Sequence, residues 1–260
     1  MPFDVRYRQT RGLITFIEDN HGPANSIWQT QVPLLAIRCE PHLFCVYEHC
    51  FNTYSDGEQG WQDTLTGAAT CAVQAPAAGF IGPYVRLGGD AGPGAGEDHY
   101  LSREDGDLIW TTGNYWAYEV LARLNDANTD DTNCIMGLSD SWADGSINST
   151  GGDPKNTLGF MGFTKTEGET SWNLWSQENA NVDQQAGIIT RDALWHRFGM
   201  IYDLDGGLKF FYDGQQVGAT QTDTTDRSVA AEMFLGFGIE NSSANAGTID
   251  VAEVRLVQLR

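Results

Sequence analysis

The 260-residue sequence predicts an all-β fold, a two-sheet antiparallel jelly-roll sandwich that carries an N-terminal extension. Its 30 Gly, 8 Trp, 9 Tyr and 12 Phe, against only 5 Met, favour short strands and tight turns over long helices. Short apolar stretches alternate with clusters of Gly, Asn and Asp at roughly regular spacing. No stretch has a convincing helical period and no segment of about 20 to 50 residues repeats, so we expect neither a helical nor a repeat fold.

The N-terminal extension comprises residues 1–42, the least regular part of the chain. It contains two apolar strand candidates, residues 13–17 and 32–37, joined by a loop. We expect the extension to pack either on the main domain or on a neighbouring subunit.

Residues 43–260 are expected to form one sandwich domain. Glycine and proline make residues 88–96 a loop inside this domain, and residues 140–155 form a long polar loop. The strand candidates, chosen by alternation and by turn residues at their ends, are residues 43–51, 53–64, 66–74, 80–87, 110–124, 134–138, 158–164, 171–177, 194–218, 231–239 and 248–259.

The clearest stretch, residues 194–218, predicts three antiparallel strands joined by two tight turns. Alternation around His196 to Tyr202 indicates a half-buried first strand. The first turn is predicted at residues 203–207, where aspartates and two glycines allow the chain to reverse direction. The second turn is predicted at Asp213-Gly214, because Asp-Gly is a strong hairpin signal. A meander of this kind needs a second sheet to bury its apolar face.

The same meander resembles the laminin-G-like or concanavalin A-like lectin/glucanase jelly roll. The similarity lies in the runs LWHR through IY and GLKFFYDGQQVG, and in the closing run GTIDVAEVR, where Val251 and Ala252 stand as extra residues before the acidic one. Residues 47–51 and Gly60-Trp61 also resemble early strands of such domains, so the likeness covers about residues 43–260. The resemblance implies the fold and leaves the function open among lectins, glycosidases, lyases, adhesive modules and virion proteins.

The charge balance narrows the class of partner. Fifteen Lys plus Arg against 35 Asp plus Glu give a formal net charge of -20, which opposes binding to nucleic acid or to an anionic membrane. No run of about 18 apolar residues or secretory signal is present, so we expect no membrane insertion and no export. The odd number of cysteines, five, favours free thiols in a reducing compartment.

The extension is locally basic, in contrast to the rest of the chain. Arg6, Arg8 and Arg11 stand against Asp4 alone in the first twelve residues. This local inversion of charge is suited to an arm that docks on an acidic partner.

Cysteine and histidine gather near the start of the sandwich domain, at Cys39, His42, Cys45, His49 and Cys50. Thiolate and imidazole are the ligands that zinc prefers. The spacing is not that of a standard zinc finger, and neighbouring residues on a strand point to opposite faces. Zinc binding therefore stays open beside the simpler interpretation of buried cysteines.

An acidic turn offers oxygen ligands for calcium at Asp126, Asp130 and Asp131, and a second set is Asp203 with Asp205. Folds that this chain resembles hold calcium near sugar-binding loops. Aspartate is also an ordinary turn residue. We expect no cofactor, with calcium left open.

Aromatic rings beside amides in loops are the usual signature of a glycan-binding surface. The candidates are Trp142, in the loop of residues 140–155, together with Trp172, Trp175 and the neighbouring Asn173.

Glycoside hydrolysis needs two carboxylates on either side of the scissile bond. Hydrolases of this fold carry them on one strand, as E-x-D-x-x-E or a near variant, and no such strand is present. Glu119 stands alone, and regular alternation places Asp250 and Glu253 on opposite faces. No lyase constellation can be assembled either, so we expect no enzymatic activity.

The sequence is best interpreted as a non-enzymatic virion structural protein, a capsid decoration or a head or tail appendage of a bacteriophage, made in the host cytoplasm. Its arm would anchor it to other virion proteins or to a second copy, and the jelly roll would face outward and adhere to surface glycans. The alternatives are a stand-alone carbohydrate-binding lectin module and a glycosidase or lyase.

Overall fold

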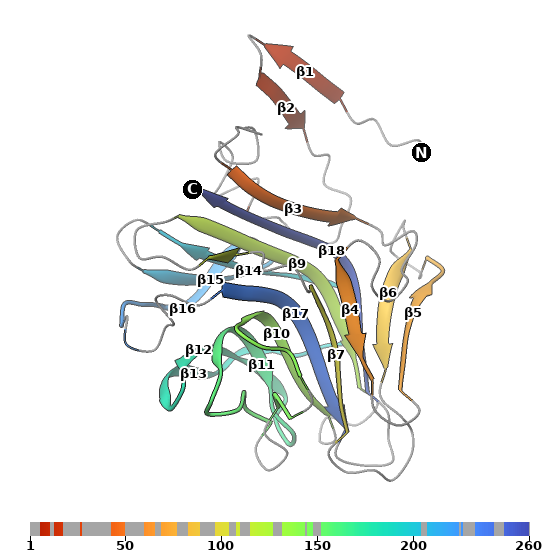
Figure 1. The fold of residues 1–260 in the computed structure, drawn as a ribbon, viewed down its shortest axis with the longest axis vertical. Helices are drawn as coiled ribbons and strands as arrows, with labels where there is room; N and C mark the ends of the chain where they lie inside the picture. Colours follow the sequence, from red (N-terminus) through yellow and green to blue (C-terminus); the bar gives the residue numbers. More distant parts are fainter. Residues whose placement is uncertain are drawn as a thin grey trace.

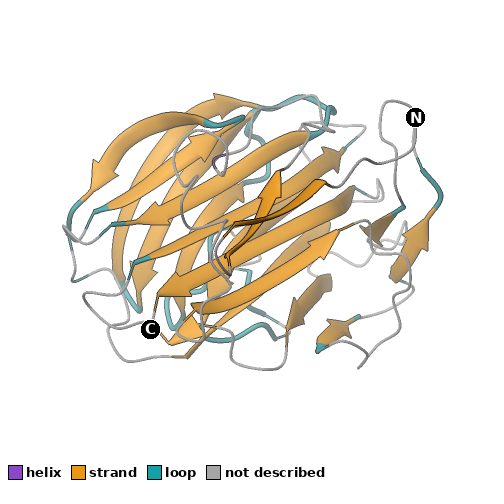
Figure 2. Cartoon of the chain, turned by 90° about the horizontal axis from the view of Figure 1, so that it is seen from above, coloured by secondary structure: helices purple, strands orange, loops and turns teal. Residues whose placement is uncertain are grey.

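The computed structural model consists of two antiparallel sheets of eight strands each that pack face to face, beside a separate two-stranded sheet (Figure 1, Figure 2). The structure describes residues 6–10, 13–17, 27, 43–49, 60–65, 69–76, 83–88, 97–103, 108–109, 115–126, 132–143, 145–147, 152–203, 207–223, 225, 232–241 and 247–259. Within these ranges, Ile27 alone is helical. The described ranges contain no helix of the length and apolarity that a bilayer crossing requires.

Sheet I has the order β13-β12-β11-β10-β17-β7-β4, with β8 paired to β17. Its strands are β4 (Trp61–Thr64), β7 (Glu97–Arg103), β8 (Leu108–Ile109), β10 (Thr132–Ser139), β11 (Gly159–Lys165), β12 (Ser171–Glu178), β13 (Asn181–Thr190) and β17 (Glu232–Asn241).

Sheet II has the order β16-β15-β14-β9-β18-β6-β5, with β3 paired to β18. Its strands are β3 (Leu43–His49), β5 (Thr70–Gln74), β6 (Tyr84–Gly88), β9 (Trp116–Asn125), β14 (His196–Tyr202), β15 (Leu208–Tyr212), β16 (Gln215–Gln221) and β18 (Thr248–Leu259). The late strands β17 and β18 lie in the middle of the two sheets, which is the crossing pattern of a jelly roll. The predicted fold class is therefore confirmed.

The main core lies between the two sheets and is rich in aromatic rings. Phe163 of sheet I packs edge-on against Phe198 and Phe210 of sheet II, with ring centroids 5.2 and 5.4 Å apart. The predicted inner face of β9 is confirmed, because its alternate residues all join this core: Trp116, Tyr118, Val120, Ala122 and Leu124. This interlocked layer holds the sheets at a fixed separation.

The predicted meander is confirmed as β14, β15 and β16, joined to β9 by β14. Asp213 and Gly214 have φ values of 50° and 75°, the left-handed pair that a tight two-residue hairpin requires. The expectation that β14 is half buried is wrong, since six of its seven residues are buried. Its outer face, which points away from sheet I, is covered.

Part of that cover comes from the N-terminal extension. Ile27 is fully buried against apolar residues on the outer face of sheet II, namely Ala117, Ile201, Phe211 and Val257. Its backbone N–H donates a 2.7 Å hydrogen bond to Glu119 Oε2. Gly199 makes room for it, because a Cβ there would lie 3.0 Å from Ile27 Cγ2. At least this point of the extension is therefore an integral part of the domain.

Replacing Ile27 by valine is expected to lower the free energy of unfolding by about 0.5–1.5 kcal/mol, because it removes one methyl group from a closed apolar site. Ile188→Val is the matched control, since Ile188 is exposed on β13. We expect it to change stability by less than about 0.5 kcal/mol. Urea unfolding followed by tryptophan fluorescence measures both, and equal stabilities would contradict the burial of Ile27.

The start of the extension forms a hairpin of β1 (Arg6–Thr10) and β2 (Leu13–Ile17), which stands outside the two sheets in Figure 1. Arg6 and Arg8 lie on β1, at positions that pair with Ile17 and Thr15, and Arg11 lies outside the described residues. Among the described strands, β1 and β2 pair only with each other. The strand predicted at residues 32–37 also lies outside the described residues.

A β-bulge in β18 changes which residues share a face. The register of β18 against β9 shifts between Val251 and Glu253, so Ala252 is the extra residue. Val251 and Val254 both join the inter-sheet core, whereas Ala252 packs on the outer face. The expectation that Asp250 and Glu253 lie on opposite faces is therefore wrong: the bulge brings both to the outer face of sheet II.

The two sheets are joined along one side by side-chain amides. The Gln185 amide of β13 accepts from the Ala219 N–H (2.7 Å) and donates to the Ala219 carbonyl (2.9 Å) of β16. In return, Gln221 of β16 donates to the Asp183 carbonyl at 3.0 Å. These bonds satisfy backbone groups that an edge strand otherwise leaves open.

Candidate functional site

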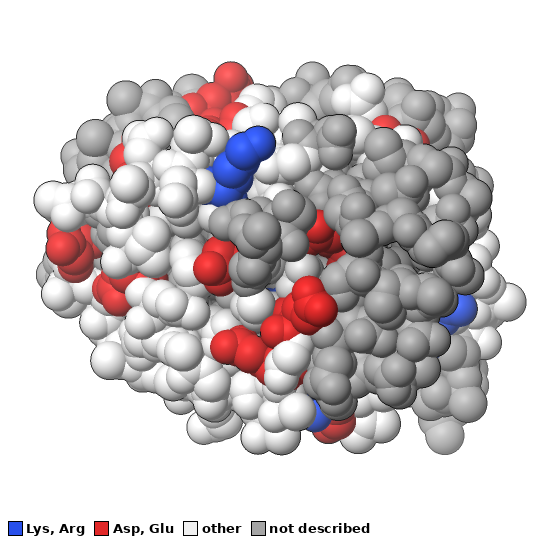
Figure 3. All heavy atoms as spheres, turned by 90° about the horizontal axis from the view of Figure 1, so that it is seen from below, with Lys and Arg blue, Asp and Glu red and all other residues white. Residues whose placement is uncertain are grey.

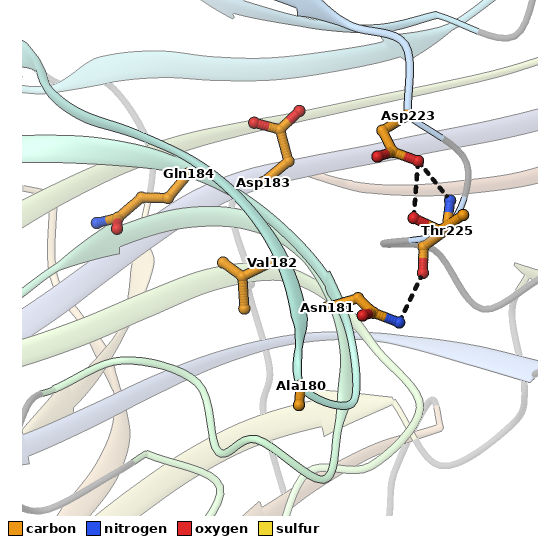
Figure 4. Close-up of a pocket in the computed structure, with 7 residues that line it drawn as sticks. All are labelled: Ala180, Asn181, Val182, Asp183, Gln184, Asp223 and Thr225. Atoms are coloured by element: carbon orange, nitrogen blue, oxygen red, sulfur yellow. Dashed lines mark hydrogen bonds between the residues drawn. The ribbon is translucent and has the colours of Figure 1, made fainter.

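An open depression of about 470 Å³ lies beside this junction, where the β12–β13 hairpin faces the segment that follows β16 (Figure 4). The chain turns into β13 through Asn179, whose φ of 54° suits asparagine. The lining residues are Ala180, Asn181, Val182, Asp183, Gln184, Asp223 and Thr225. The site is thus built from one edge strand and one facing loop.

Hydrogen bonds fix the facing loop. Asp223 Oδ1 accepts from the backbone N–H of Thr225 (2.9 Å) and from its hydroxyl (2.8 Å). Asn181 on β13 donates to the Thr225 carbonyl at 3.3 Å. Figure 4 shows the carboxylates of Asp183 and Asp223 on the same side of the depression. The carboxylates of Asp183 and Asp223, the Asn181 amide and the Thr225 hydroxyl therefore border one open space.

The lining residues of β13 are divided between the two faces of the strand. Asn181 and Asp183 point toward Asp223, whereas Val182, which is 42% exposed, and Gln184 point to the other face (Figure 4). The side that faces Asp223 is polar, which suits a ligand with many hydroxyl groups.

The outer face of sheet I, which points away from sheet II, has a different character. Its buried apolar cluster comprises Tyr100, Ile135, Ile147, Phe160 and Trp175, with Trp142 packed against it. Trp142 Nε1 donates to the Phe234 carbonyl at 2.8 Å, and its ring fills the space above Gly236. The loop after β10 therefore folds back over the sheet and covers its aromatic floor.

The predicted glycan-binding residues are not gathered at one open surface. Trp142 and Trp175 share the outer-face cluster, whereas Trp172 belongs to the inter-sheet core. Trp172 and Trp175 are only 3% and 5% exposed, and Asn173 is buried with its amide bonded to Glu169 and to the Gly187 N–H. The expected exposed rings are absent at these two tryptophans, because both faces of β12 are covered.

The predicted calcium residues are only partly described. Asp126 is buried between cations, with Lys165 Nζ at 3.5 Å and Arg191 Nη1 at 3.9 Å. Asp130 and Asp131 lie outside the described residues. Asp203 pairs with Lys209 and accepts from the Gly207 N–H, while Asp205 is not described.

The predicted zinc cluster falls largely outside the described residues, as Cys39, His42 and Cys50 do. Cys45 and His49 lie on β3, at positions that pair with Val257 and Glu253 of β18. In the described part of the chain, no three His, Cys, Asp or Glu side chains are grouped so that they could hold a metal ion. Cys134 is a free thiol in the core, and burial raises its pKa.

Carboxylates on the outer face of sheet II are committed to arginines. Arg197 bridges Glu119 Oε1 (3.1 Å) and Glu253 Oε2 (2.9 Å), and Arg255 also pairs with Glu253. All four side chains are buried. Regular strand pairing places them side by side, and the bulge at Ala252 brings Glu253 into the group.

Asp250 forms a second buried group on the same outer face. Arg86 Nε donates to its Oδ1 at 2.7 Å, and Arg123 and Asn125 donate to its Oδ2. The Arg123 guanidinium also lies over the Trp195 ring, 4.9 Å from its centroid. Asp250 and Glu253 thus lie on the same face of sheet II, where their ion pairs with arginines link neighbouring strands.

His196 is held between two carboxylates near the Asp213-Gly214 turn. Its Nδ1 lies 2.8 Å from Asp213 Oδ2 and its Nε2 lies 2.8 Å from Asp192 Oδ1, and its ring stacks on Tyr212. Carboxylates only accept, so both ring nitrogens must donate, which requires the charged imidazolium. Burial lowers the pKa of His196, but the hydrogen bonds and charges of Asp213 and Asp192 outweigh it and raise the pKa above its usual value.

We expect His196→Gln to destabilise the protein by about 1 kcal/mol at slightly acidic pH and much less at alkaline pH. A raised native pKa contributes stability below the unfolded value of about 6.5 and loses it as the pH rises through the native pKa. Urea unfolding across this range measures the difference, and Asp192→Asn should lower the pKa seen in an NMR titration. A His196 pKa at or below about 6.5 would contradict the arrangement.

The residues of the depression were not among the sequence candidates. Asn181 to Gln184 lie on β13, a largely exposed strand without the alternation that marks a buried face. The signal that was available is the Asn179-Ala180 turn directly after the predicted strand of residues 171–177, which favours a returning strand.

No protein-family model matches the chain, and no curated protein matches its sequence. Solved structures do match. A protein of unknown function from Shewanella oneidensis MR-1, SO2946, has a TM-score of 0.57 at 13% identity, covering 83% of this chain and 86% of that one.

Two further structures are similar over most of their length. The carbohydrate recognition domain of Emp47p has a TM-score of 0.54 at 12% identity, covering 82% of this chain and 94% of that one. The endo-β-1,4-glucuronan lyase of the fungus Trichoderma reesei has a TM-score of 0.54 at 11% identity, covering 81% and 94%. Such identities establish the fold alone: the chain has a concanavalin A-like jelly-roll fold.

Proposed function

We propose that the protein binds carbohydrate in the depression between β13 and the facing residues Asp223 and Thr225. The observation that carries this proposal is an open site bordered by the carboxylates of Asp183 and Asp223, the Asn181 amide and the Thr225 hydroxyl. Sugars offer the complementary chemistry, because the hydroxyl groups around the edge of a ring donate hydrogen bonds to carboxylates. The likeness of the fold to carbohydrate recognition domains supports the proposal by analogy.

The proposal is for binding without catalysis. Two carboxylates that share the outer face of sheet II, Asp250 and Glu253, are buried in ion pairs with arginines. A glycosidase needs a carboxylic acid and a carboxylate that both reach the scissile bond. A polysaccharide depolymerisation assay with the purified protein tests this part, and release of reducing ends above that of a heat-inactivated sample would contradict it.

Binding is tested with a glycan array followed by calorimetry on the glycans that bind. We expect Asn181→Ala and Asp183→Ala each to weaken binding about tenfold, because each removes a hydrogen-bonding group that faces the depression. Gln74→Ala is the matched control, since Gln74 lies on β5, at the other edge of sheet II from β16. Unchanged affinity in both site variants, or no glycan bound at all, would contradict the proposal.

A virion structural role, as capsid decoration or head or tail appendage, is a second proposal and is compatible with the first. The observation that favours it is the separate β1–β2 hairpin, because a two-stranded sheet is at best marginally stable alone and gains stability on a partner. Its partners would be other virion proteins or a second copy. A purified protein that is a monomer and does not sediment with particles would contradict this role.

A further inference from the structure

We infer that Arg86 and Arg123 form a second ligand site, on the outer face of sheet II, which binds the carboxylate group of a small ligand such as an acidic sugar. The site lies on β6, β18 and β9, and β9 is three strands away from β16, so the site is separate from the depression. The inference does not depend on the proposed carbohydrate binding, because it rests on the unused donors of two guanidinium groups.

Strand pairing brings the two arginines to one carboxylate. Asp250 of β18 lies opposite Arg86 of β6 on one side and opposite Arg123 of β9 on the other. Arg86 donates from Nε to Oδ1 (2.7 Å) and from Nη2 to Oδ2 (2.9 Å), and Arg123 donates from Nε (3.1 Å) and Nη2 (2.5 Å) to the same Oδ2. Because both Nη2 atoms bond Oδ2, the two guanidinium groups lie side by side.

This group of three residues keeps one positive charge. The Asp250 side chain is fully buried, and in the described part of the chain it is the only carboxylate within ion-pair distance of either arginine. Arginine stays protonated at physiological pH, so two cations share one anion. The side chains of Arg86 and Arg123 are 33% and 17% exposed, so a ligand can reach them from solvent.

Each arginine also keeps an unused edge. A guanidinium presents Nε and Nη2 on one edge and Nη1 and Nη2 on another, and both arginines turn the first edge toward Asp250. No acceptor among the residues that the structure describes bonds either Nη1 atom. The edge formed by Nη1 and Nη2 can bind a carboxylate through two parallel hydrogen bonds, which is the recognition that arginine performs best.

Neighbouring rings hold both guanidinium groups in place before a ligand arrives. The Arg123 guanidinium lies 4.9 Å from the ring centroid of Trp195 and 5.9 Å from that of Tyr84. The Arg86 guanidinium lies 5.7 Å from the Tyr84 centroid, and its Nη2 is 3.4 Å from the Tyr84 hydroxyl. Side chains that are already ordered lose little further freedom on binding, which favours affinity.

The acidity of the rest of the protein does not cancel this attraction. The chain has a net charge of -20, and Figure 3 shows acidic side chains in several separate places on one face, with few Lys and Arg between them. At physiological ionic strength, exposed charges farther away than about 8 Å are largely screened. One ion pair at about 4 Å strengthens binding about fivefold even in water. For a ligand with a single negative charge, the contacts with the two arginines therefore outweigh the general repulsion.

The test is an NMR titration of isotopically labelled, full-length protein in which NaCl is replaced by sodium acetate or sodium glucuronate at constant ionic strength. We expect both salts to shift the side-chain Nε–H signals of Arg86 and Arg123 and to saturate them with a Kd of about 10 mM or below. Uncharged methyl glucoside should leave these signals unchanged. A lower Kd for glucuronate than for acetate identifies an acidic sugar as the ligand, and equal values identify the carboxylate group alone.

Variants separate a role in binding from a role in folding. Arg123→Lys keeps a cation beside Asp250 and loses the two-donor edge, so the Kd for acetate should rise at least about fivefold. Arg103→Lys is the matched control: Arg103, on β7 of sheet I, also lies over a tryptophan ring, and the Kd should not change. Asp250→Asn removes the competing carboxylate and should lower the Kd at least about fivefold. If that variant does not fold, the lysine variant decides the question.

The outcomes are independent of the proposed function. Arg86 and Arg123 signals that do not change when acetate replaces chloride overturn the inference, and so does a Kd for acetate that Arg123→Lys leaves unchanged. Neither result bears on the depression beside β13, whose own test uses glycans and variants of Asn181 and Asp183. Carbohydrate binding in the depression can therefore fail while this inference stands, and the reverse.

Discussion

Replacing Arg197 by methionine is expected to lower the free energy of unfolding by about 3–5 kcal/mol at neutral pH. Arg197 is buried and pairs with Glu119 at 3.1 Å and Glu253 at 2.9 Å. Methionine keeps much of the side-chain volume and removes the charge, so two buried carboxylates lose their shared cation. The cost is that of uncompensated buried charge, which far exceeds the net value of the intact pair.

A second variant identifies the mechanism of this loss. Arg197→Lys should fall between the wild type and the methionine variant, because an ammonium group keeps the charge but cannot bridge both carboxylates as a guanidinium does. Chemical unfolding at pH 7 compares the three proteins, and a methionine variant as stable as the wild type would contradict the account.

The second large effect is expected at Gly137, where substitution by alanine should lower the free energy of unfolding by about 3 kcal/mol or more. Gly137 of β10 lies directly opposite Gly162 of β11, and a Cβ added to Gly137 would overlap the carbonyl oxygen of Met161. Its φ of 153° is also a conformation that residues with a side chain rarely adopt. The obstacle is backbone in a hydrogen-bonded ladder, so no rotamer change relieves it.

Gly88→Ala is the matched control for this substitution. Gly88 also lies in a strand, but the nearest atom to an added Cβ is the Thr248 methyl group at 3.3 Å, part of a side chain that can shift. We expect a change of about 0.5 kcal/mol or less there. Thermal and urea unfolding compare the two variants, and a Gly137→Ala protein within about 1 kcal/mol of the wild type would contradict the close backbone approach.

The sequence patterns predicted the fold where strands bury one alternating face. The β9 strand and the β14–β16 meander lie where alternation and the Asp213-Gly214 turn predicted them. Strand β13 was missed because it is mostly exposed, so hydrophobic periodicity carried no signal there. Strand β7, which crosses the loop-rich middle of the chain, was missed as well.

Long-range contacts limited what could be predicted about sites. Alternation alone cannot reveal that the loop carrying Trp142 folds over the outer face of sheet I, or that both faces of β12 are covered. The low exposure of Trp172 and Trp175 results from these contacts, which the sequence of β12 alone does not reveal. Equally, the extra residue at Ala252 places Asp250 and Glu253 on the same face of β18, where regular alternation predicted opposite faces.

The depression depends on the closure of the sandwich. Gln185 and Gln221 hold β13 against β16, and Asp223 and Thr225 then stand opposite Asn181 and Asp183. These partners are about 40 residues apart in the sequence, and polar residues at an exposed edge have no periodic signature. The candidate site therefore became recognisable only through the arrangement of two edges in space.

The central claim, that a glycan binds between β13 and the facing residues Asp223 and Thr225, is tested most directly by NMR on isotopically labelled, full-length protein titrated with an uncharged oligosaccharide. We expect the backbone amide signals of residues 180–184, Asp223 and Thr225 to shift progressively and to saturate together. The indole signal of Trp142, on the outer face of sheet I, should stay unchanged. Shifts concentrated at Trp142 and its neighbours, with none at the depression, would contradict the claim.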